Sequence, residues 1–399
     1  MTMVPWLLAR TWALVLACGL AASAAQARPD FPRTVTDVAG RTVVLKAPPQ
    51  RIFMANGNHV MALLLLERED PWARLSGWAN AIRSSDPTTW AWLRSRWPHA
   101  VEVPELKISA DVHADIEQLL ALKPDLLLLD LRSRPAVESG PLHRVAQRMG
   151  IPILYADTSR EPVRNTPRTV TMLGEVLGRE GRATEYVRFY GERLERLQRA
   201  QPAREQRPTV FLEVRAGRMG LEQCCYTQGA TSWGQLIEAA GGINLGNNLL
   251  RGINGDVSIE TLMQLKPDLY LMTGTQQRIL GARTIPFGLG ADKASAQDAM
   301  WRLMRRPGLA LASRGANQCV LALTHQFHDN PMNIVGLEYL ARGLYPVLRD
   351  ELDPVTTWRA VVDRFTSLPQ MPFVFEAAMR WGGGACQDDE SNGVYTPPT

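Results

Sequence analysis

The chain has 399 residues, a formal net charge of +4 at pH 7 and 45% hydrophobic residues. This length exceeds what one simple core needs and favours two domains. The positive charge is small and scattered, whereas nucleic-acid binding calls for clustered basic residues, so that function class is excluded. No later segment has 18 consecutive apolar residues, so nothing after the N-terminal region is predicted to span a membrane.

The N-terminus has the pattern of a secretory signal peptide. Arg10 precedes an apolar stretch, Thr11 to Ala22, that is short for a bilayer span, and Ala25-Gln26-Ala27 fits the small-x-small cleavage pattern. We therefore expect residues 1–27 to direct export and to be removed. A retained membrane anchor and lipidation at Cys18 are the alternatives; the bulky Leu16 argues against lipidation.

The first predicted elements are a β-hairpin, a strand and a helix. Thr34 to Leu45 alternates around a turn and reads as the hairpin, and Arg51 to Ala55 is a short apolar strand. After the polar turn Asn56-Gly57-Asn58, residues His59 to Glu67 read as a helix. Turns of this kind form the ligand-binding edge of α/β sheets. A tryptophan-rich stretch follows, in which Trp78 is a candidate wall of a ligand site.

A repeated motif then defines the fold class. Residues 114–130 (ADIEQLLALKPDLLLLD) and 257–273 (VSIETLMQLKPDLYLMT) share nine of 17 aligned positions at a constant offset of 143 residues. Each copy reads as a short helix, a Lys-Pro break and a buried, parallel strand. Two copies predict two similar α/β lobes with a ligand cleft between them.

The predicted organisation follows from these copies. We expect an N-terminal α/β lobe at 33–160, a helical connector at 161–203, a C-terminal α/β lobe at 208–380 and a disordered tail at 382–399. Within the connector, Gly178 and Gly181 are expected to separate two helices, the second spanning Ala183 to Ala200.

Four cysteines follow the predicted signal: Cys224, Cys225, Cys319 and Cys386. Export would favour pairing, and no metal-binding spacing is present. Because adjacent cysteines rarely bridge each other, we expect Cys224 or Cys225 to pair with Cys319 or Cys386. The alternative is that one of these cysteines acts as a thiolate ligand or as a nucleophile.

Four segments together resemble a known family. The hairpin TVTDVAGRTVVL, the two repeat blocks and AAGGINL (Ala239 to Leu245) resemble the periplasmic binding proteins that serve ABC importers of iron–siderophore, haem and cobalamin. The segment Asp329 to Pro346 is similar to the metal-chelate branch. The resemblance implies two Rossmann-like lobes joined by a single long helix, a monomer located in the periplasm, a small-molecule metal chelate as cargo, no further cofactor and no catalysis. It also implies a permease partner in the inner membrane.

The resemblance further implies two docking residues. In the family, a glutamate on each lobe contacts arginines of the permease, and the matching positions here are Glu117 and Glu260. Each opens a repeat helix, where an acidic side chain is also favoured simply by the helix dipole.

Ligand-binding residues are expected in the loops that follow the strands. In the first lobe the candidates are Asn56, Asn58, His59, Trp78, Asn80, Arg132 and Arg134. In the second lobe they are Arg215, Arg218, Tyr226, Gln276, Arg278, His325 and His328. Arginines in both sets suit an anionic chelate, most of all a ferric siderophore. His59 and His325 are placed so that either could ligate metal directly, although each could equally be a hydrogen-bonded structural histidine.

Other functions stay open on the sequence alone. The same fold could bind haem, cobalamin, free metal or a nickel–amino-acid chelate, or could act as a sensor or adaptor. A hydrolase is disfavoured because the segment Ala230 to Gly234 is an incomplete nucleophile elbow around Ser232. No phosphate-binding loop, dinucleotide motif or HExxH metal motif is present.

Overall fold

The computed structural model describes residues 31–106, 116–221, 224–277, 281–309, 319–380 and 394–395. The predicted signal at 1–27, the possible lipidation at Cys18, Arg278, Cys386 and the predicted tail, apart from two residues of a strand, lie outside the described residues. None of the described helices combines the length and the hydropathy that a membrane span needs.

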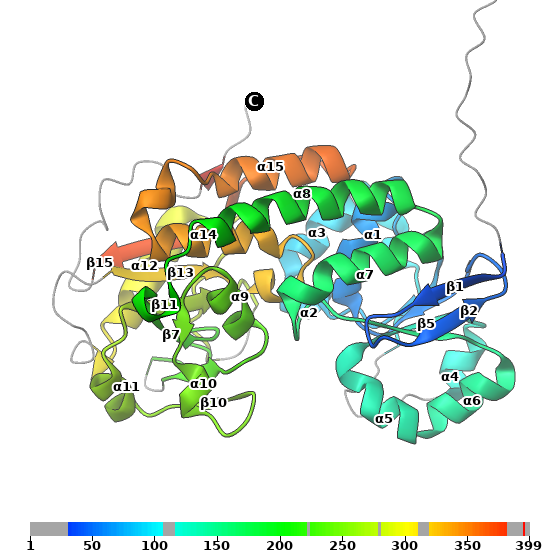
Figure 1. Ribbon diagram of the computed structural model, residues 1–399, viewed down its shortest axis with the longest axis horizontal. Coiled ribbons are helices and arrows are strands. Elements are labelled where there is room, and N and C mark those ends of the chain that lie inside the picture. Colours follow the sequence, from blue (N-terminus) through cyan, green and yellow to red (C-terminus); the bar gives the residue numbers. More distant parts are fainter. Residues whose placement is uncertain are drawn as a thin grey trace, which may run out of the picture. The chain divides into compact units, whose positions relative to one another are not determined.

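A four-stranded parallel sheet forms the first half of the fold, in the order β4-β3-β5-β6. Figure 1 labels one of its strands, β5. Its strands are β3 (Ile52–Met54), β4 (Leu75–Trp78), β5 (Leu126–Asp130) and β6 (Ile153–Ala156). Every residue of these strands is buried, as expected for a parallel sheet covered on both faces.

The predicted hairpin is confirmed as β1 (Arg33–Thr36) paired with β2 (Thr42–Leu45). Asp37, which is 1% exposed, accepts bonds from the Arg41 guanidinium and from the backbone N–H of Tyr155 in β6. The turn of the hairpin is thereby fixed to the edge of the first sheet.

Short helices accompany this sheet. They are α1 (Val60–Leu66), α2 (Ile82–Ser85), α3 (Pro87–Arg96), α4 (Ile116–Ala121), α5 (Arg134–Ser139) and α6 (Pro141–Met149), with 3-10 turns at Gly57–His59, Pro98–Val101 and Leu131–Ser133. All seven residues of α1 are buried, which explains its unbroken apolar sequence VMALLLL.

The tryptophan-rich stretch forms a core cluster. Trp78 has no exposed surface and packs edge-on against Trp72, with ring centroids 6.1 Å apart, and against Trp90 at 5.6 Å. The prediction that Trp78 walls an open ligand site is therefore not met, because β4 directs this side chain into the core.

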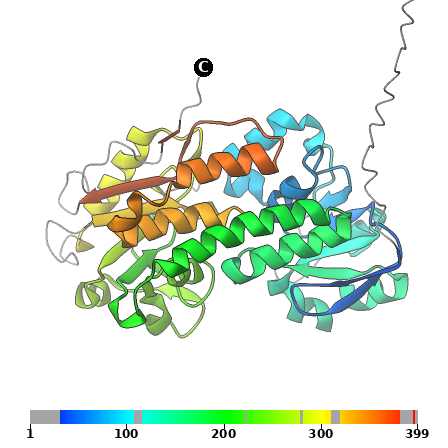
Figure 2. The same cartoon turned by 45° about the horizontal axis from the view of Figure 1, so that its top comes forward.

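Two long helices follow, α7 (Pro162–Leu177) and α8 (Glu180–Arg199). Gly178 ends α7 in a left-handed conformation with φ of 67°, as predicted, but Gly181 lies inside the first turn of α8 and separates nothing. Figure 2 shows α8 alongside α15 (Pro354–Phe365), where the rings of Phe189 and Phe365 lie 4.9 Å apart.

The second half contains a five-stranded sheet in the order β15-β13-β11-β7-β9. Its strands are β7 (Thr209–Glu213), β9 (Ile243–Asn244), β11 (Leu269–Gly274), β13 (Cys319–Thr324) and β15 (Glu376–Arg380). Only β15 runs antiparallel to its neighbour, so four of the strands again form a parallel sheet.

Smaller strands and further helices complete this half. The strands are β8 (Tyr226–Gln228), β10 (Asn254–Asp256), β12 (Gly288–Leu289), β14 (Phe373–Val374) and β16 (Val394–Tyr395). The helices are α9 (Trp233–Ala239), α10 (Gly246–Leu249), α11 (Ile259–Leu265), α12 (Lys293–Met304), α14 (Asn333–Leu344) and α15, with 3-10 turns at Arg204–Gln206, His325–Asp329 and Pro346–Arg349.

The two copies of the repeated motif form the same structure. Each gives a short helix and a central strand, α4 with β5 and α11 with β11. The motif lysine is left-handed in both copies, with φ of 48° at Lys123 and 44° at Lys266. The motif aspartate then accepts backbone N–H groups at the start of the neighbouring strand, Asp125 from Gln50 and Arg51 and Asp268 from Thr209. The motif thus aligns two adjacent parallel strands in each half.

The cysteine pairing differs from our expectation. The structure joins Cys224 to Cys225 as a disulfide between chain neighbours, across a cis peptide bond. Both sulfurs are used in this pair, which differs from the pairing that we expected.

Candidate functional site

The candidate site is built on the loops that follow the parallel strands. In an α/β sheet, ligands bind at the carboxyl ends of the strands. Here β7, β11 and β13 lie side by side, so the residues after their last positions come together. These residues include Arg215 and the 3-10 turn His325–Asp329, and the hydroxyl of Thr273, within the last two residues of β11, lies beside them.

Arg215 is the most unusual of them. Its backbone is left-handed, with φ of 48°, and its N–H donates to the Thr273 hydroxyl at 2.7 Å. Its Nε is buried and has no hydrogen-bond partner among the described residues. Burial lowers the pKa of Arg215, and the charge of Arg218 lowers it further. A guanidinium held in this way favours a negatively charged partner.

Two histidines lie beside this arginine. The rings of His325 and His328 are 4.2 Å apart, and His325 is only 3% exposed. Burial lowers the pKa of both side chains, and the charge of Arg215 contributes in the same direction. Both imidazoles are therefore expected to be neutral at pH 7.

The hydrogen bonds of these two histidines determine which ring nitrogens are left to bind a ligand. His328 Nδ1 lies 2.7 Å from the backbone oxygen of His325, and a carbonyl oxygen only accepts, so Nδ1 carries the proton. In the neutral ring, Nε2 of His328 then keeps its lone pair. His325 Nδ1 lies 3.1 Å from the Thr273 hydroxyl. The pair thus offers a nitrogen that could accept a hydrogen bond or ligate a metal.

The turn that carries the histidines also reaches the first sheet. Asp329 accepts a bond of 2.6 Å from the Asn58 side chain and one of 2.8 Å from the Thr158 hydroxyl. Asn58 follows β3 and Thr158 follows β6, so this carboxylate of the second half contacts two strand ends of the first half. The charge of Arg132, after β5, lowers the pKa of His328 from the same side. Polar groups of both sheets therefore meet at this turn.

Several residues predicted for the first half are already engaged. The Asn56 side chain donates to Asp130 at 2.9 Å, Asn80 donates to Glu105 at 3.0 Å, and Arg134 donates to Glu138 at 2.9 Å. These three side chains are held by acidic neighbours. A ligand would have to compete with those bonds.

The first-half histidine is buried. His59 has no exposed surface, and neither of its ring nitrogens has a hydrogen-bond partner among the described residues. It lies at the start of the fully buried helix α1. Direct ligation of an incoming ligand by His59 would therefore require local opening.

The other predicted residues of the second half lie nearby in the chain but serve different contacts. The Arg218 guanidinium stacks over the Tyr226 ring at 4.4 Å, and Gln276 donates to the Leu289 carbonyl at 3.1 Å. Arg218 and Tyr226 also line a cavity of 320 Å³ beside Cys224.

Asp329, Thr158 and Thr273 were missed by the sequence reasoning. A charged residue in the polar segment THQFHDN was visible in the sequence, but the direction of its side chain depends on the turn His325–Asp329. Thr158 and Thr273 carry no motif, and only the packing of neighbouring strands shows their roles.

The two predicted docking residues occupy equivalent positions. Glu117 and Glu260 lie in the first turns of α4 and α11, and both are exposed. The pKa of Glu260 is lowered by its own backbone N–H and by the Ser258 hydroxyl.

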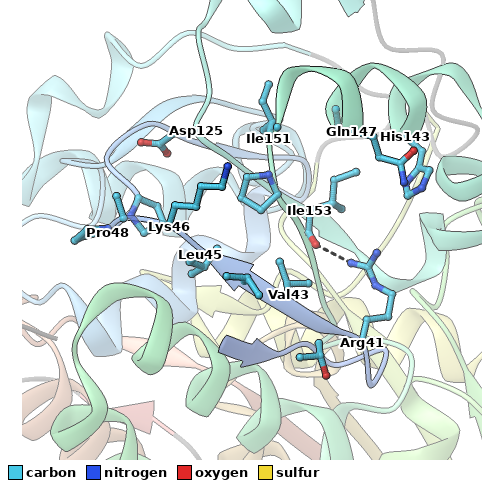
Figure 3. Close-up of a pocket in the computed structure, with 17 residues that line it drawn as sticks. Arg41, Val43, Leu45, Lys46, Pro48, Asp125, His143, Gln147, Ile151 and Ile153 are labelled. Atoms are coloured by element: carbon cyan, nitrogen blue, oxygen red, sulfur yellow. Dashed lines mark hydrogen bonds between the residues drawn. The ribbon is translucent and has the colours of Figure 1, made fainter. Parts of the chain in front are cut away.

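A second described cavity has a volume of 460 Å³ and lies between β2, α6 and the segment 150–153 (Figure 3). The Arg41 guanidinium crosses it to the Ile153 carbonyl at 2.7 Å. None of the residues predicted for the ligand site lines it.

Comparison with known proteins decides the family. The model of the periplasmic binding protein family matches residues 63–310, which is more than half of the chain. The chain belongs to the periplasmic binding protein family. Members of this family bind a small solute and pass it to the permease of an ABC importer, and they are not enzymes.

Solved structures show the same fold. A TroA-like periplasmic binding protein, FepB from Veillonella parvula, has a TM-score of 0.77 and 24% identity over 88% of this chain and 100% of that chain. CeuE from Helicobacter pylori in a nickel–histidine complex has a TM-score of 0.60 and 15% identity, covering 85% of this chain and 96% of its own. MolA from Haemophilus influenzae bound to molybdate has a TM-score of 0.60 and 14% identity, covering 85% and 99%. The curated proteins contain no match to this chain.

Proposed function

We propose that this periplasmic binding protein captures an anionic metal chelate, most specifically a ferric siderophore, and delivers it to a permease in the inner membrane. In this proposal the lobes 33–160 and 208–380 are joined by the connector 161–203, with α8 as its long helix. The cargo lies in a cleft between the lobes, and residues 1–27 direct export.

The observation that carries the cargo class is Arg215. Its Nε is buried without a described partner, and its pKa is lowered by burial. A desolvated cation of this kind is costly in the empty protein and is stabilised when an oxyanion supplies the missing acceptor. Carboxylate, catecholate and hydroxamate groups of a metal chelate all supply such oxygens.

The neighbouring groups fit the same cargo. Arg132 approaches from the first half, and the neutral His325 and His328 add no positive charge of their own. The site would therefore bind a ligand with modest net negative charge spread over several oxygens. A ligand bound here would contact strand ends of both sheets, because Asp329 of the second half already binds Asn58 and Thr158 of the first.

A second cargo is favoured by a separate observation. The lone pair on Nε2 of His328 suits direct coordination of a metal ion, because Nδ1 is bound to the His325 carbonyl. The nickel–histidine complex of CeuE is a cargo of that type. A nickel chelate or a free metal ion is therefore the alternative to the ferric siderophore, and haem and cobalamin are tested beside them.

Intrinsic fluorescence offers a direct test. The indole N–H of Trp233 donates to the His325 carbonyl at 3.2 Å, so this tryptophan touches the site. We expect ferric chelates to quench the protein, and Arg215→Ala to weaken their binding about ten- to a hundredfold, as for a lost charge-assisted bond of about 1.5–3 kcal/mol.

Two controls make this test specific. Arg199→Ala removes an exposed arginine at the end of α8 and should leave the affinity unchanged. Trp233→Phe should remove the largest share of the quenching. If haem or a corrinoid quenches instead of the ferric chelates, the cargo is one of those two. If only bare nickel or zinc binds tightly, and Arg215→Ala has no effect, the anionic-chelate assignment fails.

Permease docking through Glu117 and Glu260 is a separate part of the proposal. Both side chains are exposed and open equivalent helices of the two repeats. Charge pairs at a protein interface govern orientation and association rate. Reversal of both charges should abolish uptake and leave cargo affinity within about threefold. A comparable reversal at Glu192 and Glu195 on α8 serves as the control, and loss of cargo binding in the docking variant would contradict the assignment.

A further inference from the structure

The bonded pair Cys224 and Cys225 lies at the 320 Å³ cavity that Arg218 and Tyr226 line. Cys224 is partly exposed and lines this space of 320 Å³, whereas Cys225 is fully buried and does not. The other lining residues are Glu213, Val214, Gly217, Arg218, Met219, Tyr226 and Asp256. A molecule in the cavity therefore meets one sulfur of the pair and not the other.

The buried sulfur has a hydrogen-bond donor behind it. The Tyr270 hydroxyl lies 3.6 Å from Cys225 Sγ and 2.8 Å from a carboxylate oxygen of Glu213. Arg306 also binds Glu213, with bonds of 2.7 Å and 2.5 Å to its two oxygens. The single hydroxyl proton can therefore turn to the sulfur while Glu213 keeps its arginine.

This arrangement disfavours a resident metal ion. Glu213, Cys224 and Cys225 are close enough to share one, with their ligand atoms within 4.8 Å of one another. Both oxygens of Glu213 are, however, bonded to Arg306, and the two sulfurs are bonded to each other. Ligation would take the Glu213 carboxylate away from the buried Arg306.

The cavity also carries complementary charges. The Arg218 guanidinium lies over the Tyr226 ring, and Asp256 is the cross-strand partner of Tyr226. Both charged residues line the space next to Cys224. Since Glu213 is neutralised by Arg306, the cavity presents one cation and one carboxylate. A small thiol with both a carboxylate and an ammonium group matches that pair.

We propose that the Cys224–Cys225 disulfide is a thiol-exchange site for small zwitterionic thiols. The thiolate of such a molecule attacks Sγ of Cys224, and the bond between Cys224 and Cys225 breaks. The electron pair leaves on Sγ of Cys225, where the Tyr270 hydroxyl stabilises the thiolate. The product is a mixed disulfide on Cys224 and a thiolate on Cys225. A second thiol then releases Cys224 as a thiol, so that two small thiols become one disulfide.

This reaction is independent of the cargo assignment. It rests on the cavity, the unequal burial of the two sulfurs and the Tyr270 contact, and none of these depends on what the protein transports. Arg218, which lines the cavity, nevertheless lies close in the chain to Arg215, the candidate arginine of the cargo site.

The test treats the intact protein with three thiols and divides each rate by the rate of the same thiol with a small reference disulfide, because a thiolate of higher pKa is intrinsically more nucleophilic. Cysteine is zwitterionic, mercaptoacetate carries only the carboxylate, and cysteamine carries only the ammonium group. Mass spectrometry after acid quenching should place the mixed disulfide on Cys224. Cysteine should react about tenfold faster than either of the other thiols, because it satisfies both Arg218 and Asp256.

Variants separate the parts of the site. Arg218→Ala and Asp256→Asn should each slow cysteine about three- to tenfold and remove its advantage, whereas Arg199→Ala should not. Tyr270→Phe should slow all three thiols by a similar factor. If Tyr270→Phe fails to fold, the proposal is still tested by which cysteine carries the adduct and by the relative rates of the three thiols.

Three results would overturn the proposal. They are an adduct on Cys225, equal rates for all three thiols, and native mapping that pairs either cysteine with Cys319 or Cys386.

Discussion

The two parallel sheets share a scaffold but differ in the polar residues at their strand ends. Lys123 and Lys266 have the same left-handed backbone, and Asp125 and Asp268 hold the neighbouring strand in the same way. At the strand ends of the first sheet, Asn56, Asn80 and Arg134 bind acidic neighbours, and His59, without a described partner, is fully enclosed. At those of the second sheet, Arg215 keeps a buried Nε with no described partner.

This difference indicates that duplication preserved the framework while recognition diverged. A side chain that is already hydrogen-bonded must give up that bond before it can bind a ligand, so its net contribution is small. An unsatisfied buried group gains the full bond. We therefore expect the second sheet to supply most of the cargo affinity and the first sheet to supply shape and closure.

The largest expected effect compares two arginines in the two halves. Arg306 is 3% exposed and holds the buried Glu213, the last residue of β7, whereas Arg134 forms a partly exposed pair with Glu138. Arg306→Ala leaves an uncompensated buried carboxylate and should lower the free energy of unfolding by about 3–5 kcal/mol. Arg134→Ala should cost less than about 1 kcal/mol.

Urea unfolding of both variants, followed by circular dichroism, gives the comparison. The companion Arg306→Met with Glu213→Leu removes both charges and should recover part of the loss. Equal losses for Arg306→Ala and Arg134→Ala would show that the buried pair has no special role.

The second prediction concerns pH and the helix packed on the second sheet. Burial raises the pKa of Glu338 in α14 from 4.5 to about 7, although the Arg193 guanidinium lies 3.7 Å away. The folded protein therefore holds this proton more tightly than the unfolded chain does. Stability from Glu338 is fully present below pH 4.5 and is lost as the pH rises to about 7, by about 3 kcal/mol in total.

Glu338→Gln should remove this part of the pH dependence. The stability of the variant relative to the native protein should therefore increase as the pH rises from 5 to 8. Thermal unfolding across that range measures the difference, and Glu260→Gln, at an exposed position, is the matched control. If the two variants have the same pH profile, the neutral form of Glu338 is not favoured in the fold.

A third prediction addresses the contact between the two halves. Asp329 accepts side-chain bonds from Asn58 and Thr158, which follow different strands of the first sheet. Asp329→Ala should leave both donors unpaired and cost about 1–3 kcal/mol. Hydrogen exchange should then increase around residues 56–59 and 157–159 and stay unchanged in β9 and α10. Protection that is unchanged everywhere would mean that Asp329 does not hold the halves together.

The sequence predicted the scaffold well because its signals are local. The hairpin 33–45 alternates with period two, and the repeat motif carries a helix, a break and a strand within 17 residues. The site was less predictable because it depends on side-chain direction in turns. Trp78 entered the core because β4 is buried on both faces, and Asp329 was missed because its role comes from strands 170 or more residues away.

The cysteine pair shows the same limit for a different reason. Adjacent cysteines rarely form a disulfide with each other, and nothing in the sequence indicates that these two are an exception. In the structure, Cys225 is enclosed by a buried cluster that includes Phe211 and Tyr270, and Tyr270 lies 45 residues further along the chain. Only tertiary packing encloses Cys225 and leaves Cys224 beside a cavity.

The smallest effects should come from the shared motif itself, where the two halves are expected to respond alike. Asp125 accepts two backbone N–H groups, and Asp268 accepts the N–H and the hydroxyl of Thr209. All these bonds are exposed, so each aspartate should contribute about 0.5–1.5 kcal/mol. Asp125→Ala and Asp268→Ala should therefore lower stability by similar amounts, and the double variant should show their sum because the two aspartates hold strands of different sheets. Asp350→Ala, at an exposed position outside both motif copies, is the control. A clear effect in one half only would mean that the copies, although identical in sequence at this point, no longer have the same structural role.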